Sequence, residues 1–178
     1  MGFNHCGEGR EETTRVAMNW MDYGMGLARA ASKRSKDPWR KVGAVVLRKD
    51  NSVAGVGYNG FPAGMWEDWE DRESRRKFVI HAEANALRYC KPDEGRMLCC
   101  TTLPCNECLR LIAGYGIRCI VYGDDYERDQ STIDIADYFG IDLKQISLVE
   151  KADDGLLKED RIRCDKRIGS TPPSAGSA

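Results

Sequence analysis

Apolar residues recur at helical spacing in the first part of the chain. The positions concerned mostly fall three or four residues apart: Val16, Ala17, Trp20, Met21, Leu27, Ala28 and Ala31. This spacing predicts an amphipathic helix over 13–33, with Thr13 or Thr14 as its N-cap. Asp37-Pro38 ends the pattern, because proline disfavours helical geometry in the residue before it.

Two short apolar runs follow and predict a β-hairpin. Residues 42–47 form the first run, 49–51 a polar turn, and 52–58 the returning strand. Residues 59–64 are a loop marked by Gly and Pro, and the segment 66–77 is too charged for a core.

The remainder alternates between helical and strand patterns. Helices are expected over 81–89, 105–115 and 131–139, and strands over 97–102, 117–122 and 143–148. Such alternation after a hairpin favours an α/β fold with parallel crossovers. We divide the chain into a flexible N-terminus at 1–12, one domain at 13–150, and a C-terminal extension at 151–178 whose Gly/Ser/Pro-rich tail is expected to be disordered.

Composition narrows the class of protein. The chain has 178 residues, 42% of them hydrophobic, which suits one domain with its own core. Its 27 basic and 28 acidic residues nearly balance, which favours a small anionic substrate over long nucleic acid. The sequence has no apolar run of about 18 residues and no secretory signal. We therefore expect no membrane span and a cytoplasmic location. The eight cysteines are then better explained as thiols or metal ligands than as disulfides.

Two segments carry candidate chemistry, His81-Ala82-Glu83 and Pro104-Cys105-Asn106-Glu107-Cys108. Cys105 and Cys108 are three residues apart, so on one helical turn both sulfurs face the same side. Together with the His81 imidazole they offer three ligands to Zn²⁺ and leave the fourth position open for water, as in catalytic zinc sites.

Glu83 suits a proton shuttle and not a ligand. Zinc lowers the pKa of water, and a nearby carboxylate can accept the proton and deliver it to a ring nitrogen and a departing amine. At a helix tip, the N–H groups of Ala82 and Glu83 are also free donors for a pyrimidine carbonyl. A CxxC alone is equally a redox pair or half of a structural zinc site, and a histidine alone is often a cap. In this order the segments match the H-x-E…P-C-x-x-C signature of zinc deaminases.

Five blocks, two of which contain the zinc signature, carry a wider match. They are Arg34-Ser35-Lys36-Asp37-Pro38, Val42-Gly43-Ala44-Val45-Val46, Gly57-Tyr58-Asn59-Gly60-Phe61-Pro62, His81-Ala82-Glu83-Ala84-Asn85-Ala86 and Leu103-Pro104-Cys105-Asn106-Glu107-Cys108. On these residues the sequence resembles the cytidine deaminase superfamily, and most closely the deoxycytidylate (dCMP) deaminase family, over roughly 20–148.

The resemblance implies a three-layer α/β/α sandwich with a mixed five-stranded sheet and zinc between two helix tips. It implies hydrolysis of dCMP to dUMP and ammonia, which supplies dUMP for thymidylate synthesis. It also implies a homo-oligomer, commonly a hexamer, regulated by dCTP and dTTP, with Mg²⁺ accompanying a bound triphosphate. Some members hold a second zinc with residues of the insertion before the histidine. Residues 64–80 here contain neither Cys nor His, so that zinc is not expected, although His5 and Cys6 could be distant substitutes.

Substrate contacts follow from the same blocks. The residues expected at the nucleotide are Asn59, Ala82, Arg34, Ser35, Lys36, Val42, Ala44, Thr102, Leu103, Pro104 and Tyr126. Asn59 would bind a sugar hydroxyl or base edge, or simply make a turn with the glycine that follows. The stretch 34–36 would meet the phosphate, although Lys36 equally fits a solvated helix end. Val42 and Ala44 would form an apolar floor, and Tyr126 is either an aromatic beside the nucleotide or a surface tyrosine.

Two rival functions remain open from the sequence. One is a tRNA or other polynucleotide deaminase with the same zinc chemistry, and the other is a nucleotide-binding regulatory subunit with a structural zinc. Whether dCMP, dCTP or both are substrates also stays open. The basic stretch 72–77 suits a longer phosphate chain or, more simply, a solvated helix face.

Overall fold

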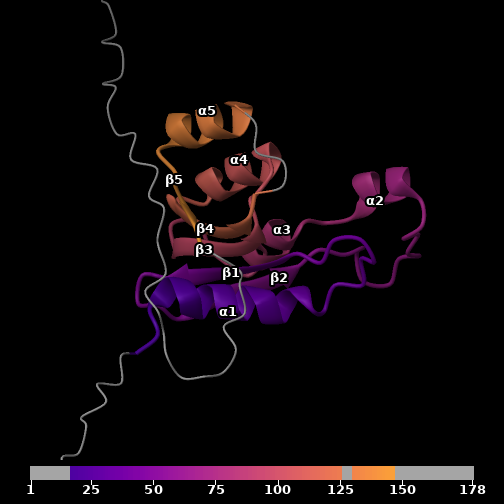
Figure 1. The fold of residues 1–178 in the computed structure, drawn as a ribbon, viewed down its shortest axis with the longest axis horizontal. Coiled ribbons are helices and arrows are strands. Elements are labelled where there is room, and N and C mark those ends of the chain that lie inside the picture. The colour runs from indigo at the N-terminus through magenta and orange to yellow at the C-terminus, as the bar shows by residue number, and fades with distance from the viewer. Residues whose placement is uncertain (1–16, 126–129, 147–178) are drawn as a thin grey trace, which may run out of the picture.

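The computed structural model describes residues 17–125 and 130–146 and builds them around a five-stranded mixed sheet (Figure 1). The strands are β1 (Gly43–Arg48), β2 (Val53–Tyr58), β3 (Gly95–Thr102), β4 (Cys119–Asp124) and β5 (Asp142–Gln145), in the spatial order β2-β1-β3-β4-β5. β1 runs antiparallel to both β2 and β3, whereas β3, β4 and β5 are parallel. The predicted hairpin and parallel crossovers are therefore confirmed.

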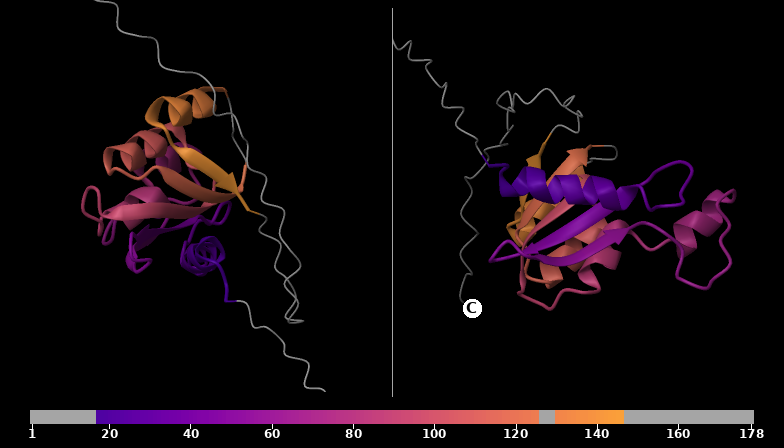
Figure 2. Two further views of the ribbon diagram at one scale, coloured as in Figure 1. Left: turned by 90° about the vertical axis from the view of Figure 1, so that its left-hand side faces the viewer. Right: turned by 90° about the horizontal axis from the view of Figure 1, so that it is seen from below.

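Helices cover both faces of the sheet. They are α1 (Trp20–Ser32), α2 (Arg72–Phe78), α3 (Ala82–Leu87), α4 (Asn106–Gly114) and α5 (Gln130–Phe139). α1 lies alone on one face, and α3, α4 and α5 lie on the other, which Figure 2 shows from two sides. This confirms the three-layer sandwich with a mixed sheet.

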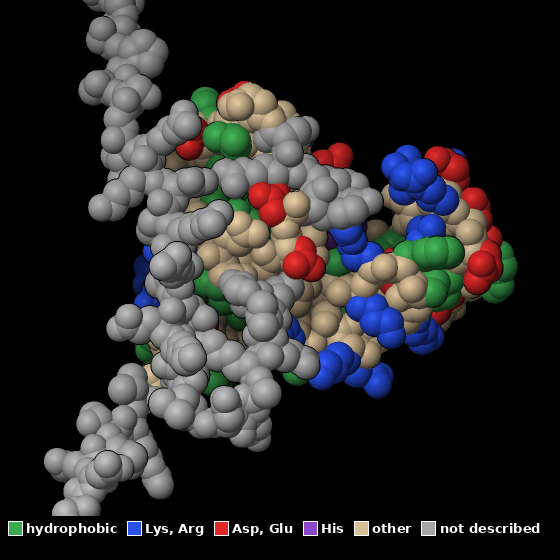
Figure 3. Space-filling model, viewed as in Figure 1, with side chains coloured by type: hydrophobic (Ala, Val, Ile, Leu, Met, Phe, Trp, Pro, Cys, Tyr) green, Lys and Arg blue, Asp and Glu red, His purple; other side chains and the backbone are tan. Residues whose placement is uncertain are grey.

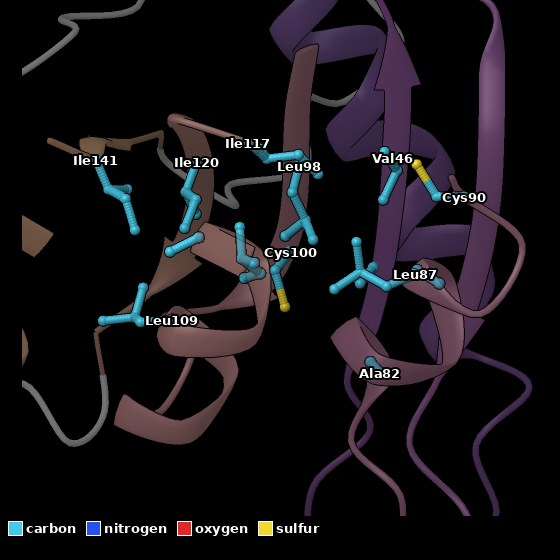
Figure 4. Packing of buried hydrophobic residues seen from close by; sticks show 14 of the residues in the cluster. Val46, Ala82, Leu87, Cys90, Leu98, Cys100, Leu109, Ile117, Ile120 and Ile141 are labelled. Atoms are coloured by element: carbon cyan, nitrogen blue, oxygen red, sulfur yellow. The ribbon is translucent and has the colours of Figure 1, made fainter. Parts of the chain in front are cut away.

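Alternation along the strands separates two hydrophobic clusters. Val45 and Cys99 face α1, whereas Val46 and Cys100 face α3 and α4 (Figure 4). Successive strand side chains point to opposite faces, so the paired apolar residues fill both layers at once. The adjacent cysteines are thus small buried hydrophobes, and burial raises the pKa of Cys99 to about 12.

The first helix begins later than its apolar spacing suggests. Residues 17–19 are not helical, and α1 starts at Trp20, where the Asn19 side chain accepts a hydrogen bond from the Asp22 N–H at 2.9 Å. Asparagine is among the best N-cap residues, because its oxygen satisfies an N–H that the helix leaves unpaired. The expected caps, Thr13 and Thr14, lie outside the described residues.

The charged segment after β2 forms a lobe that carries α2 away from the sheet (Figure 1). Asp71 caps α2 by accepting hydrogen bonds from the N–H groups of Glu73 and Ser74, and no residue of α2 is buried. Phe61 and Trp69 pack edge to face with centroids 4.8 Å apart and hold the lobe together.

Glycines of β2, Gly55 and Gly57, let α3 approach the sheet closely. A Cβ on Gly57 would lie 2.4 Å from both the Ala82 oxygen and the Ala86 nitrogen of α3. Only glycine leaves room for this contact between backbones. β2 therefore sets the position of the helix that starts next to His81. Within the described residues, the helices all fall short of the length and hydrophobicity that crossing a bilayer requires.

Candidate metal centre and active site

Two helix starts meet at the end of β3. His81 is the N-cap residue of α3 and Cys105 is the N-cap residue of α4, and neither side chain caps its own helix. Cys108 follows in the first turn of α4. Side chains that do not cap a helix can turn toward a shared point, and the positive helix ends there favour anionic sulfur.

The three side chains lie at distances that fit one zinc ion. The His81 Nδ1 is 3.6 Å from the Cys105 Sγ and 3.4 Å from the Cys108 Sγ. Tetrahedral zinc with Zn–N of about 2.0 Å and Zn–S of about 2.3 Å would place a nitrogen and a sulfur about 3.5 Å apart. All ligand atoms lie within 4.8 Å of one another, so the donor set and its spacing both suit zinc.

Without metal, the centre is a thiolate beside an imidazolium. A hydrogen bond from Cys108, followed by one from His81, lowers the pKa of Cys105 to about 3. The hydrogen bond with Cys105 raises the pKa of His81 to about 9. The hydrogen bond with Cys105 and burial of the thiol both raise the pKa of Cys108. At pH 7 the metal-free centre therefore holds protons on His81 and Cys108.

These protonation states predict proton release on metal binding. At pH 7, adding Zn²⁺ to chelator-treated protein should release about two protons per ion, because zinc ligands must be deprotonated. Zinc affinity should rise with pH as His81 and Cys108 lose their protons. A pH indicator in weak buffer measures the release. Cys108→Ser should lower it, Cys119→Ser should leave it unchanged, and release of no protons in the unmutated protein would contradict this description.

Glu83 lies beside the ligand group in the first turn of α3. Its side chain is buried, with 4% of the residue exposed, and it lines the same cavity as His81 and Cys105. Burial raises the pKa of the carboxyl group above its ordinary value, and the neighbouring His81 opposes this. A carboxyl group whose pKa moves toward neutrality is suited to accept and return a proton.

A cavity of about 520 Å³ opens in front of these residues, within the range for small-molecule sites. Nine of the residues predicted from the sequence contribute to its wall: Val42, Asn59, His81, Ala82, Glu83, Thr102, Leu103, Pro104 and Cys105. Cys108 lies in the ligand group, 5% exposed. The structure thus brings most of the predicted site together, although the role of each residue stays a prediction.

Asn59 is held in place by the loop before β1. Its Oδ1 accepts a hydrogen bond from the Val42 N–H at 2.8 Å, and its Nδ2 donates to the Asp37 carboxylate and the Arg40 carbonyl. Both amide hydrogens are thereby used within the protein. What Asn59 can still offer a ligand is the second lone pair of Oδ1, as an acceptor.

Four other predicted residues are absent from the cavity wall, so their contact with a nucleotide stays a prediction. Ser35 is buried, and its hydroxyl donates to the Asn59 carbonyl at 2.9 Å. Lys36 forms an ion pair with Glu67 at 2.8 Å, and Arg34 is exposed. Ala44 is fully buried among core residues of the sheet. Tyr126 lies outside the described residues.

Other cavity residues lie outside the set expected at the nucleotide, although the basic stretch 72–77 was considered for a longer phosphate chain. They are Asp37, Arg40, Arg72, Arg75, Arg76, Val79, Asn106 and Thr132. Asn106 joins α4 to α5, since its Oδ1 accepts from the Thr132 hydroxyl at 3.0 Å and its Nδ2 donates to the Ser131 hydroxyl. The sequence does indicate that the arginines at 72, 75 and 76 lie together, because positions i, i+3 and i+4 share one helix face.

Comparison with known proteins matches residues 18–124 to the family described as the cytidine and deoxycytidylate deaminase zinc-binding region. The human deoxycytidylate deaminase is 33% identical over 127 residues, 65% of this chain and 71% of that protein. The probable deoxycytidylate deaminase of Drosophila melanogaster is 35% identical, and the match covers 65% of this chain and 64%, just under two thirds, of that protein. The deoxycytidylate deaminase of Mycobacterium phage D29 is 40% identical over 58% of this chain and 94% of its own length.

A solved structure shares the fold. The dCMP deaminase from the cyanophage S-TIM5, in complex with dCMP and dUMP, superposes with a TM-score of 0.62 and 32% identity. The similarity covers 70% of this chain and 94% of the cyanophage chain.

Proposed function

Because this chain belongs to the cytidine and deoxycytidylate deaminase family, we propose that it is a zinc-dependent enzyme that hydrolyses dCMP to dUMP and ammonia. The observation that carries the proposal is one centre. It combines His81, Cys105 and Cys108 at zinc-ligand spacing with a buried Glu83 in the same cavity. The names of the relatives, and the dCMP and dUMP in the cyanophage complex, support the choice of nucleotide.

The chemistry divides between the metal and Glu83. When bound by His81, Cys105 and Cys108, zinc lowers the pKa of a coordinated water toward about 7. The Glu83 carboxylate takes a proton from the attacking water and gives it to N3 of the pyrimidine as the C4–O bond forms. It then takes the proton of the new C4 hydroxyl and gives it to the amino group, so that the C4–N bond breaks and ammonia leaves. The product keeps a proton on N3 and a carbonyl at C4.

The remaining wall orients the base and limits access of water. We expect Val42, Leu103 and Pro104 to offer apolar surface to the pyrimidine ring, and the Ala82 N–H at the start of α3 to donate to its carbonyl oxygen. A preformed wall of this kind holds the reacting atoms close together, which removes part of the entropic cost of the reaction.

Neither rival function gains a specific observation. The near balance of 27 basic and 28 acidic residues gives little reason to expect a polynucleotide substrate. A zinc ion that was only structural would normally take a fourth protein ligand, whereas the group found in the described part of the chain has three and lies at a cavity.

A panel of substrates tests the proposal. The zinc-loaded protein should convert dCMP to dUMP with release of ammonia and should leave tRNA unchanged. CMP, deoxycytidine and dCTP with Mg²⁺ complete the panel. Added dCTP or dTTP tests for the effector control that the family resemblance implies. The resemblance also implies a homo-oligomer, commonly a hexamer. Turnover of tRNA together with no turnover of any mononucleotide would overturn the proposal.

A further inference from the structure

One face of α2 presents arginines to the cavity of the metal centre. Arg72, Arg75 and Arg76 stand at positions i, i+3 and i+4 of the helix, and all three line the cavity that His81 and Glu83 also line. In Figure 3, Lys and Arg side chains gather around the hollow between the lobe that carries α2 and the rest of the molecule. This basic wall comes from a segment that contributes nothing to the sheet.

Arg75 is held firmly between two neighbours. Its guanidinium lies 3.7 Å from the Asp37 carboxylate and 5.5 Å from the centre of the Trp39 ring, and 19% of its side chain is exposed. Within the described residues, its buried Nε has no hydrogen-bond partner. A buried donor without a partner is costly, so an acceptor that reached this Nε would gain a hydrogen bond that the protein itself does not supply.

The other face of α2 is electrically balanced. Lys77 lies 4.0 Å from Glu73, one turn away, and both side chains are 65% exposed. Neither residue lines the cavity. The positive charge of α2 is therefore concentrated on the face that meets the metal centre, and Asp37 offsets only part of it.

Two of the three residues expected to bind phosphate, Ser35 and Lys36, make contacts with other parts of the protein. The Ser35 hydroxyl donates to the Asn59 carbonyl, and Lys36 pairs with Glu67 within the loop that leads to α2. Neither side chain lines the cavity. The α2 arginines, in contrast, line the same cavity as the groups that act on the base.

We propose that Arg72, Arg75 and Arg76 bind the 5′-phosphate of the nucleotide and make the enzyme select a deoxynucleoside monophosphate over the uncharged deoxynucleoside. The inference rests on the proposed function and specifies how that site recognises its substrate. Guanidinium groups suit this role, because their fixed N–H pairs bind phosphate oxygens in a bidentate way. Arg75 supplies a preorganised contact, and the more exposed Arg72 and Arg76 close on the phosphate from the rim.

The test compares charged and uncharged forms of one base. For Arg72→Ala and Arg76→Ala, kcat/KM for dCMP should fall on the order of tenfold or more each, mainly through KM, because hydrogen bonds to charged groups are among the strongest. Activity on deoxycytidine should stay within about twofold, because that substrate has no phosphate to lose. The double variant should abolish most of the preference for dCMP. Arg72→Gln and Arg76→Gln repeat the test with longer side chains, in case the alanine variants are unstable.

The matched control is Lys77→Ala, which removes the same charge from the opposite face of the same helix. It should leave the ratio of dCMP to deoxycytidine turnover unchanged. An equal loss in Lys77→Ala, or a double arginine variant that keeps the wild-type ratio, would overturn the inference.

Binding of the product separates this inference from the proposed function. Calorimetry should show that wild-type protein binds dUMP more tightly than deoxyuridine, and that the arginine variants lose this difference. Failure of the wild type to deaminate dCMP would refute the proposed function, whereas the dUMP comparison would still decide the role of the arginines. An active wild type whose arginine variants bind dUMP normally would refute only the inference.

Discussion

Glu83→Gln is expected to lower kcat for dCMP by about 10²- to 10⁴-fold, the usual contribution of a general acid–base residue. Glutamine has nearly the same shape and fills the same buried position, but it cannot accept a proton from water and return it to N3 and the amino group. Because burial already disfavours the charged carboxylate, the neutral amide should not destabilise the fold. Steady-state ammonia release measures kcat, and the melting temperature measures stability. Zinc content by atomic absorption shows whether the variant still binds the metal.

Glu107→Gln is the matched control for this prediction. Glu107 is exposed, lies between the two cysteines in the first turn of α4, and contributes to the raised pKa of His81, yet it does not line the cavity. The substitution removes the same charge from the neighbourhood of the metal centre and should retain wild-type kcat. A Glu83→Gln variant with wild-type kcat, or one whose activity falls only because zinc is lost, would contradict the shuttle role.

The parts of the fold that were predictable depend on local patterns. The hairpin follows from two apolar runs around a polar turn, and the metal centre from residues that begin two helices, so short stretches of sequence suffice for both. The start of α1 was misplaced because apolar spacing continues before Trp20. The helix begins where the Asn19 side chain caps its first turn. β4 was placed two residues early, since Ile117 and Arg118 precede the strand and the apolar Ile117 is buried all the same.

The parts of the site that were missed depend on partners distant in sequence. Ser35 was expected at a phosphate because nothing in its own surroundings shows that Asn59 uses its hydroxyl. The arginines of α2 reach the cavity only because the lobe folds back, with Lys36 paired to Glu67 and Arg75 to Asp37. A charged helix without an apolar stripe gives no indication of which face it turns toward the protein.

The contact between β2 and α3 gives a large expected effect on stability. Gly57→Ala would bring a methyl group within 2.4 Å of backbone atoms at Ala82 and Ala86, which cannot rotate away as a side chain could. The helix or the strand must move, and overpacking of this kind costs about 1–3 kcal/mol, occasionally more. Because His81 and Glu83 belong to the start of α3, the displacement should also lower zinc affinity and kcat for dCMP. Chemical denaturation and zinc titration measure both effects.

Gly26→Ala provides a control of opposite sign. Gly26 lies exposed in α1, and a methyl group added there would meet no atom within 4 Å. Alanine at this position should raise the free energy of unfolding by about 0.5–1 kcal/mol, because glycine loses more conformational freedom than alanine on entering a helix. The two substitutions add the same methyl group, so opposite signs of their effects would show that the loss at Gly57 comes from crowding and not from the added methyl group as such. If Gly57→Ala kept wild-type stability and zinc affinity, α3 would have to lie farther from β2, and the metal centre could not depend on that strand for its position.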